Sequence, residues 1–246
     1  MIERISKAHE EFDTGLSDDD LDVDRYNPYA RFARRPVWTI AHELRSLGYR
    51  TVCIHPFYGT FFGRDRVVAN LGFDQFLDIA AFDGAARFGP YVSDEAVAEK
   101  TIALLEEPGT PLFVFIVTIE SHGAWRNNRL PPHELAPFRN EALDLPPAFL
   151  AYLRHLANAD RMIAQLGGHL ERSGDGVLCV YGDHLPSFPG IFRKMRFGDG
   201  RTDYLIWRPG HGGAPMVRDL HVRMLARSLL EVAQAPRTPL RRSAGA

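Results

Sequence analysis

A nine-residue apolar segment, PLFVFIVTI at residues 111–119, constrains the fold more than any other feature of the sequence. A strand with this composition must be covered on both faces. Strands of that kind occur mainly inside parallel sheets that have helices on either side. We therefore expect residues 111–119 to lie in the centre of a mostly parallel sheet.

Helical patterns alternate with shorter apolar runs along the rest of the chain. The patterns predict helices at 37–47, 65–71, 94–107, 147–172 and 221–233, and strands at 50–54, 177–180 and 204–207. Ser93 is suited to cap the third helix, because its hydroxyl can accept a hydrogen bond from a free backbone N–H. Residues 123–146 are expected to form a long loop. The alternation predicts a layered α/β fold with helices flanking a mostly parallel central sheet.

The chain has 246 residues, enough for one large domain. We expect an irregular N-terminal segment at 1–35, an α/β domain at 36–235 and a disordered tail at 236–246. No linker separates the first segment from the second, so both are assigned to the same domain.

Composition argues against several classes of protein. The net charge of −2 gives no reason to expect nucleic acid as a partner. No run of about 18 apolar residues could span a membrane, and the charged N-terminus lacks the apolar stretch of a signal peptide. The chain as written is therefore expected in the cytoplasm. Cys53 and Cys179 lie in apolar runs and are expected to be reduced core thiols, and Trp38 and Trp207 are expected in the core.

Histidines follow three of the predicted strands. His55 comes after the strand at 50–54, His122 after the strand at 111–119, and Asp183-His184 after the strand at 177–180. In parallel sheets, ligands bind at the carboxyl ends of the strands. Each histidine taken alone fits an ordinary turn or core residue. The three together predict one shared polar site.

The residue types at these positions point to particular chemistry. Asp183 and His184 suit a divalent cation, although the pair could instead relay a proton or cap a turn. His55 and His122 could add metal ligands or donate to an anion, and the planar guanidinium of Arg64 matches phosphate or sulfate. A cation with such donors can stabilise the oxygen charge that develops in phosphoryl or sulfuryl transfer.

Four segments in this order resemble a known family: GYRTVCIHPFYGTFFGRDRVVANLGFDQFLD, FIVTIESHGAW, VYGDHLPS and YLIW. They are similar to the sulfatase-type domain of lipoteichoic acid synthases and phosphoglycerol transferases, which belongs to the alkaline phosphatase superfamily. Members that serve the synthesis of capsule and other cell-surface polysaccharides are the most similar. The resemblance covers roughly residues 10–233, and it implies a sulfatase-like α/β fold.

The resemblance implies roles for individual residues. Asp183 and His184 match two ligands of the catalytic metal. The implied cofactor is one divalent cation, with Mn²⁺ preferred over Mg²⁺, Ca²⁺ or Zn²⁺. His55 and Arg64 match the residues that hold the phosphoglycerol group, and His122 matches a histidine that binds the substrate phosphate. The family also implies a covalent phosphothreonine intermediate.

Aromatic residues complete the implied substrate site. Phe62 stands where lipoteichoic acid synthases have a tryptophan, so an aromatic wall is kept while the indole N–H is lost. Phe61 and Trp125 are candidates for further walls of this site. Glu120 is placed to support His122 from a position behind it.

One part of the family pattern is missing. Glu11-Phe12 resembles the pair that follows the family's nucleophilic threonine, yet the four residues before it read KAHE. Ser6 and Thr14 are the nearest hydroxyls, and neither stands in a matching motif. The strand and the metal-binding glutamate that precede the threonine are also missing. We therefore expect no catalytic nucleophile, a weakly bound metal, a sheet without its first strand, and a truncated and impaired enzyme.

Two functions remain open at this point. The first is a metal-dependent phosphoglycerol-type transferase, or a phospho- or sulfo-ester hydrolase, of cell-surface polysaccharide biosynthesis. Its substrate would be a lipid or polysaccharide that bears phosphate or sulfate. The second is an inactive homologue that binds an anion or a glycan. A nucleotide-binding α/β protein is disfavoured, because no glycine-rich phosphate loop follows any strand. Full-length family members are implied to be membrane-anchored, with this domain outside the cytoplasm.

Overall fold

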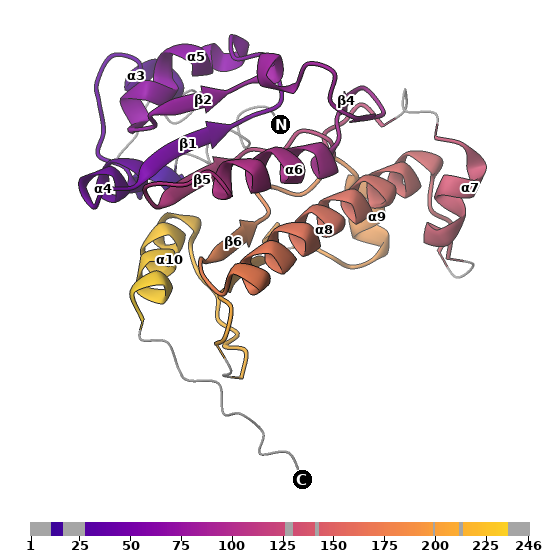
Figure 1. Cartoon of the computed structure of the whole chain (residues 1–246). Coiled ribbons are helices and arrows are strands. Elements are labelled where there is room, and N and C mark those ends of the chain that lie inside the picture. Colours follow the sequence, from indigo (N-terminus) through magenta and orange to yellow (C-terminus); the bar gives the residue numbers. More distant parts are fainter. Residues whose placement is uncertain are drawn as a thin grey trace.

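The computed structural model describes residues 11–16, 28–125, 130–140, 143–198, 200–211 and 214–235. Three parallel strands form its central sheet, in the order β2 (Gln75–Leu77), β1 (Arg50–Ile54) and β5 (Leu112–Ile116), as Figure 1 shows. Cys53 of β1 is aligned with Phe76 on one side and with Phe115 on the other. The predicted α/β fold with a parallel sheet flanked by helices is confirmed.

Strand β1, and not β5, occupies the middle of this sheet. The sequence predicts the 111–119 segment in that position, and the prediction is wrong. Four of the five residues of β1 are buried, whereas one of the five residues of β5 is buried. An apolar run indicates that both faces of a strand are covered, but it does not indicate whether both edges of the strand are hydrogen-bonded to neighbouring strands. Strand β5 has helices on its faces and lies at one edge of the three strands.

Helices cover both faces of the sheet. One face carries α3 (Pro28–Phe32), α4 (Ile40–Ser46), α5 (Arg64–Val67) and α10 (Leu225–Gln234), and the other carries α6 (Asp94–Leu105) and α8 (Pro147–Ser173). Side chains of β1 divide between the two cores, because neighbouring residues of a strand point to opposite faces. Cys53 packs in the first core, and Val52 and Ile54 pack in the second.

The long helix α8 runs beside α6 (Figure 1). Ser93 caps α6 as predicted, and its hydroxyl accepts a hydrogen bond from the backbone N–H of Ala96. Helix α4 begins at Ile40, three residues later than the pattern suggests, because the hydroxyl of Thr39 caps it.

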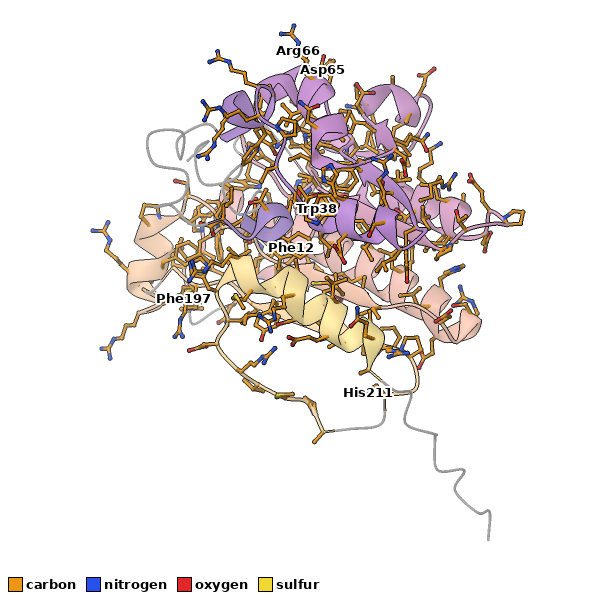
Figure 2. All side chains as sticks on the ribbon, turned by 90° about the vertical axis from the view of Figure 1, so that its left-hand side faces the viewer. Phe12, Trp38, Asp65, Arg66, Phe197 and His211 are labelled. Atoms are coloured by element: carbon orange, nitrogen blue, oxygen red, sulfur yellow. The ribbon has the colours of Figure 1, made fainter. Side chains whose placement is uncertain are left out.

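Strands β6 (Leu178–Tyr181) and β7 (Tyr204–Trp207) form a separate antiparallel pair. In the described ranges, no ladder of backbone hydrogen bonds joins β6 to β5. Phe12, labelled in Figure 2, lies between them. Its ring stacks on Phe115 of β5 at 5.5 Å and on Tyr181 of β6 at 5.2 Å between centroids. The three strand ends that carry the predicted site therefore belong to two sheets.

Several short elements are not predicted by the sequence. They are α3, β2, α7 (Pro132–Leu135), α9 (Pro189–Lys194), the hairpin β3 (Arg87–Phe88) and β4 (Tyr91–Val92), a helical turn at 11–14, and 3₁₀ turns at Phe61–Gly63, Ile79–Phe82 and Ala136–Phe138. The predicted helices at 65–71 and 221–233 include 3₁₀ turns at Val68–Leu71 and Val222–Met224. Parts of the 1–35 and 123–146 segments are thus helical where irregular chain was expected. Elements this short give too few residues for a periodic signal. The expected tail at 236–246, Ser6 and the KAHE segment lie outside the described residues.

Two side-chain predictions have different outcomes. Trp38 is 64% exposed, so its assignment to the core is wrong. Its ring lies against that of His42 instead, 5.2 Å between centroids. Cys53 is buried and Cys179 is half-buried, and both are free thiols as expected.

No helix in the part of the chain that the structure describes combines the length and the apolar character needed to cross a bilayer.

Candidate functional site

His55 follows β1 directly and is almost fully buried. Its ring Nδ1–H donates to the carbonyl of Val117 at 2.9 Å, and its Nε2 accepts from the guanidinium of Arg64 at 2.6 Å. Burial, and then the charge of Arg64, lower the pKa of His55 to about 4. The ring is therefore neutral at neutral pH, and both of its nitrogens are already in use. In this arrangement His55 orients Arg64.

Arg64 is a buried cation, with 3% of its surface exposed. Its Nε–H donates to the hydroxyl of Tyr29 at 3.4 Å, and its guanidinium carbon lies 5.4, 6.0 and 5.7 Å from the ring centroids of Tyr29, Phe61 and Phe62. Among the described residues, no carboxylate forms an ion pair with Arg64. A buried charge without a counter-ion is costly, and cation–π contacts offset only part of that cost. This environment favours binding of an anion.

The loop between His55 and Arg64 is held by Asp78. The Asp78 carboxylate accepts the backbone N–H of Gly59 at 3.2 Å. A Cβ at Gly59 would come within 2.8 Å of that carboxylate, so the turn requires glycine. Phe62 has φ = 58°, a left-handed conformation that non-glycine residues seldom adopt. This strained backbone directs its ring toward Tyr29 and Arg64.

His122 lies in the turn after β5 and its side chain is exposed. The ring Nδ1–H donates to the carbonyl of Gly123 at 2.7 Å, which leaves Nε2 as the nitrogen with a lone pair. The ring of Tyr91 meets that of His122 edge-on at 6.4 Å. After burial and Arg64, an electrostatic interaction with His122 is a further cause that lowers the pKa of His55, so the two histidines lie close enough to interact.

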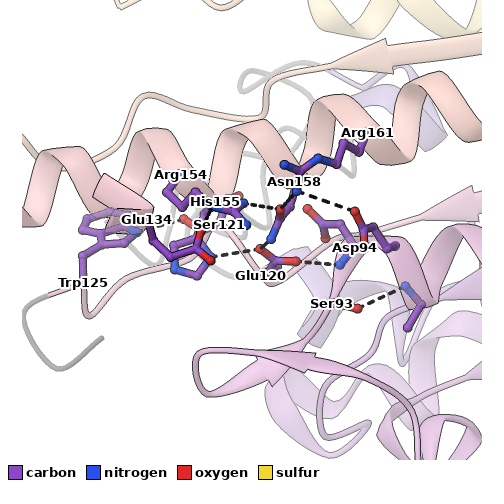
Figure 3. A network of polar contacts seen from close by, with 12 residues as sticks. Ser93, Asp94, Glu120, Ser121, Trp125, Glu134, Arg154, His155, Asn158 and Arg161 are labelled. Carbon is purple, nitrogen blue, oxygen red and sulfur yellow. Dashed lines mark hydrogen bonds and ion pairs between the residues drawn. The ribbon is translucent and has the colours of Figure 1, made fainter. Parts of the chain in front are cut away.

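Glu120 does not contact His122 through its side chain in the way the sequence suggests. It is fully buried, and its carboxylate binds His155 and Asn158 of α8 and the backbone N–H of Asp94 in α6 (Figure 3). His155, Asn158 and Asp94 were not predicted as site residues. The sequence does indicate that His155 and Asn158 lie together, because residues three apart share one face of a helix.

Asp183 and His184 stand just after β6 in the turn that begins at Gly182. The Nδ1–H of His184 donates to the carbonyl of Leu185 at 2.9 Å, so Nε2 is left for a metal. That Nε2 lies 3.7 Å from Oδ2 of Asp183. Two ligands with bonds of about 2.0–2.2 Å can share one ion at this separation. The pair therefore fits a divalent cation as two of its ligands.

The rest of a metal site is not found among the described residues, where no group of three or more His, Cys, Asp or Glu side chains is placed to hold an ion. Two ligands alone would hold a cation weakly, because structural and catalytic sites use three or four. Asp13 is a further buried carboxyl that the sequence analysis missed. Burial raises its pKa well above the ordinary value.

Aromatic residues connect the two groups of predicted site residues. Burial, and then the charge of Asp183, raise the pKa of Tyr152. The Tyr152 ring meets Trp125 at 5.5 Å and Phe188 at 6.0 Å between centroids. Trp125 belongs to the His122 turn, and its indole N–H donates to the carbonyl of Ser121 at 3.2 Å. This cluster of Trp125, Tyr152 and Phe188 packs the His122 turn against the segment after Asp183.

The sequence profile of the family described as Sulfatase matches residues 8–235. The chain belongs to the sulfatase family. It is 34% identical over 200 residues to the capsular polysaccharide biosynthesis protein RkpI of Rhizobium meliloti, a match that covers 78% of this chain and 34% of that protein. The chain spans about a third of the length of the curated relatives it matches.

Solved structures show the same fold. The lipoteichoic acid synthase LtaP from Listeria monocytogenes aligns with a TM-score of 0.64 and 20% identity, over 85% of this chain and 54% of that one. The Streptococcus pyogenes phosphoglycerol transferase GacH, in complex with sn-glycerol-1-phosphate, aligns with a TM-score of 0.63 and 20% identity, over 91% and 60%. The predicted resemblance to a sulfatase-type domain is confirmed, and these solved structures share its fold.

Proposed function

We propose that this chain carries the anion site and part of the metal site of a phosphoglycerol-type transferase, or of a phospho- or sulfo-ester hydrolase, of cell-surface polysaccharide synthesis. One observation carries the proposal: the buried guanidinium of Arg64 has a neutral imidazole and aromatic rings around it, and no carboxylate partner among the described residues. The similarity to a capsular polysaccharide biosynthesis protein supports the polysaccharide context.

The proposed division of roles follows the geometry. Arg64 and His122 bind the phosphate or sulfate of a lipid or polysaccharide substrate, and His55 fixes the direction of the guanidinium. Phe62 and Trp125 form walls of this site. Asp183 and His184 supply two ligands to a divalent cation, for which we propose Mn²⁺. Such an ion would neutralise charge on an oxygen of the bound group.

No threonine stands in the matching nucleophile position within these 246 residues. We therefore propose that the chain by itself turns substrate over slowly or not at all. An inactive homologue that binds an anion or a glycan is the second candidate, favoured by the two-ligand metal pair. The location of this chain in the cell, which the sequence predicts to be the cytoplasm, stays a prediction.

Calorimetry with inorganic phosphate tests the anion site. Arg64→Lys should weaken binding about tenfold, because lysine lacks the planar fork of arginine. Arg66→Lys is the matched control: Arg66 is exposed, lies two residues away and points away from the body of the protein (Figure 2). Equal phosphate affinity for the wild type and Arg64→Lys would refute the assigned role.

An activity assay separates the two candidate functions. A p-nitrophenyl phosphodiester and a sulfate ester are incubated with the chain and Mn²⁺, with Asp183→Ala as the comparison. We expect turnover far below the 1 s⁻¹ or more that is typical of enzymes. Turnover of about 1 s⁻¹ that is lost in Asp183→Ala would show that another hydroxyl or a water acts as the nucleophile.

A further inference from the structure

Glu120 is the first residue of the turn that carries His122, and the hydrogen bonds of its side chain run to two helices. Its Oε1 accepts the Nδ1–H of His155 at 3.0 Å and the Nδ2–H of Asn158 at 2.7 Å, both from α8. Its Oε2 accepts the backbone N–H of Asp94, the first residue of α6, at 2.7 Å. Figure 3 shows the carboxylate between the two helices. Three N–H donors on two oxygens match an ionised carboxylate.

The partners of Glu120 are themselves held in one orientation. The side-chain oxygen of Asn158 accepts from Arg154 and, at 2.8 Å, from Arg161, so its amide nitrogen must point toward Glu120. Arg154 pairs with Glu134 of α7 at 2.6 Å. The network therefore reaches from α7 through α8 to the end of β5, and neither Glu120 nor Asn158 can rotate without breaking more than one hydrogen bond.

A second carboxyl lies beside this network. Asp94 is fully buried, and neither of its side-chain oxygens has a hydrogen-bond partner among the described residues. Burial, and then the charge of Glu120, raise its pKa to about 8. Asp94 therefore keeps its proton at neutral pH, so that one negative charge, and not two, is buried in this place.

The far end of the turn is also held. The hydroxyl of Tyr91 donates to the carbonyl of Gly123 at 2.9 Å, and this carbonyl also accepts the Nδ1–H of His122. The backbone N–H of His122 donates to the carbonyl of Ile119 at 2.9 Å. Because both ends of the turn are fixed, the direction of the His122 ring depends on Glu120 at one end and on Tyr91 at the other.

We propose that Glu120 is a positioning residue that acts through His155 and Asn158 to hold His122 beside the Arg64 anion site. The expected effect on anion binding rests on the proposed function. The placement of His122 can be tested without any ligand. Glu120 itself touches no substrate, since it is fully buried behind the turn.

The direct test is NMR of the histidine rings in protein that carries isotope-labelled histidine. Glu120→Gln replaces one acceptor by a donor, so one N–H donor of the network loses its partner. We expect the ring resonances of His122 to shift and broaden. Glu99→Gln makes the same change on the exposed surface of α6 and should leave them in place. Unchanged His122 resonances in Glu120→Gln would overturn the proposal.

A double-mutant cycle separates positioning from a general structural role. Inorganic phosphate is titrated into the wild type, Glu120→Gln, His122→Ala and the double variant. We expect Glu120→Gln to weaken binding about tenfold, the typical effect of one hydrogen bond to a charged group, and to have no further effect once His122 is alanine. An equal loss in both backgrounds would show that Glu120 acts on the fold alone and would overturn the proposal.

The outcomes distinguish this proposal from the proposed function. If His122→Ala binds phosphate as tightly as the wild type, the anion role of His122 fails, and the NMR comparison still decides the role of Glu120. Should Glu120→Gln fail to fold, Asn158→Ala removes a single donor from the same carboxylate. It should shift the His122 resonances in the same direction, and no shift there would overturn the proposal.

Discussion

The two halves of the candidate site are built in opposite ways. The anion half, defined by His55 and Arg64, is buried, and each side chain has its partners in place. The metal half, defined by Asp183 and His184, is half-buried and has two ligands for a cation. Within the described residues, the side chains of the anion half are therefore held in place, whereas the metal half would need further ligands to hold a cation firmly.

The difference follows from the sheets that carry each half. His55 follows β1, which has a paired strand on both sides, and two cores cover its faces. Asp183 follows β6, which pairs only with β7 among the described strands and reaches β5 through the ring of Phe12. A rigid strand end fixes side chains better than a two-stranded ribbon does. We infer that the chain recognises an anion more readily than it holds a metal.

The largest effect is expected at the metal half. Asp183→Asn replaces a charged ligand by a neutral amide, and Mn²⁺ affinity should fall by about 100-fold, beyond the range of a calorimetric titration. Asp160→Asn, on the exposed side of α8, is the control and should not change the affinity. A similar loss in both variants would mean that the protein binds Mn²⁺ through surface carboxylates.

The anion half should make the stability of the folded protein depend on pH. The folded-state pKa of His55 is about 4, below its ordinary value of about 6.5. Between these values the unfolded chain binds a proton that the folded protein does not, so stability falls as pH is lowered from 6.5 to 4. Urea unfolding should show a loss on the order of 2 kcal/mol over this window. His55→Gln should lack this component, and equal slopes for both proteins would contradict it.

The smallest effect is expected at Phe62. Phe62→Leu removes one of three rings around Arg64, and phosphate affinity should fall about threefold, the scale of one cation–π contact. Phe197→Leu makes the same change at an exposed ring and serves as the control. A tenfold or larger loss for Phe62→Leu would mean that this ring, and not the His55 contact, sets the position of the guanidinium.

The contact between His55 and Arg64 is foreseeable from the sequence because its signals are local, while its role in binding an anion stays a prediction. His55 follows an apolar run, and Arg64 stands nine residues later in a loop whose glycines mark a tight turn. The strand order was not predictable in the same way: β2 has only Gln75–Leu77, too short for a pattern, and its pairing makes β1 the central strand. The length of the 111–119 run reflects coverage by helices, which is common to central and edge strands.

The Glu120 network was missed for a different reason. Glu120, Asp94 and His155 come from three separate elements, and each is polar where burial favours apolar residues. Nothing local in the sequence shows that three polar groups will meet. Their pairing depends on how α6 and α8 pack, which is a property of the tertiary structure.

The central claim is that both halves form one site, and Mn²⁺ itself can test it. A paramagnetic ion bound at Asp183 and His184 should broaden the ring resonances of His55 and His122 in histidine-labelled protein. His169, fourteen residues after His155 on α8 and so about 21 Å away along the helix, should keep its resonance, and Asp183→Asn should abolish the broadening. If His169 broadens as much as His122, or His122 stays sharp at full Mn²⁺ occupancy, the two halves do not share a site and the account is wrong.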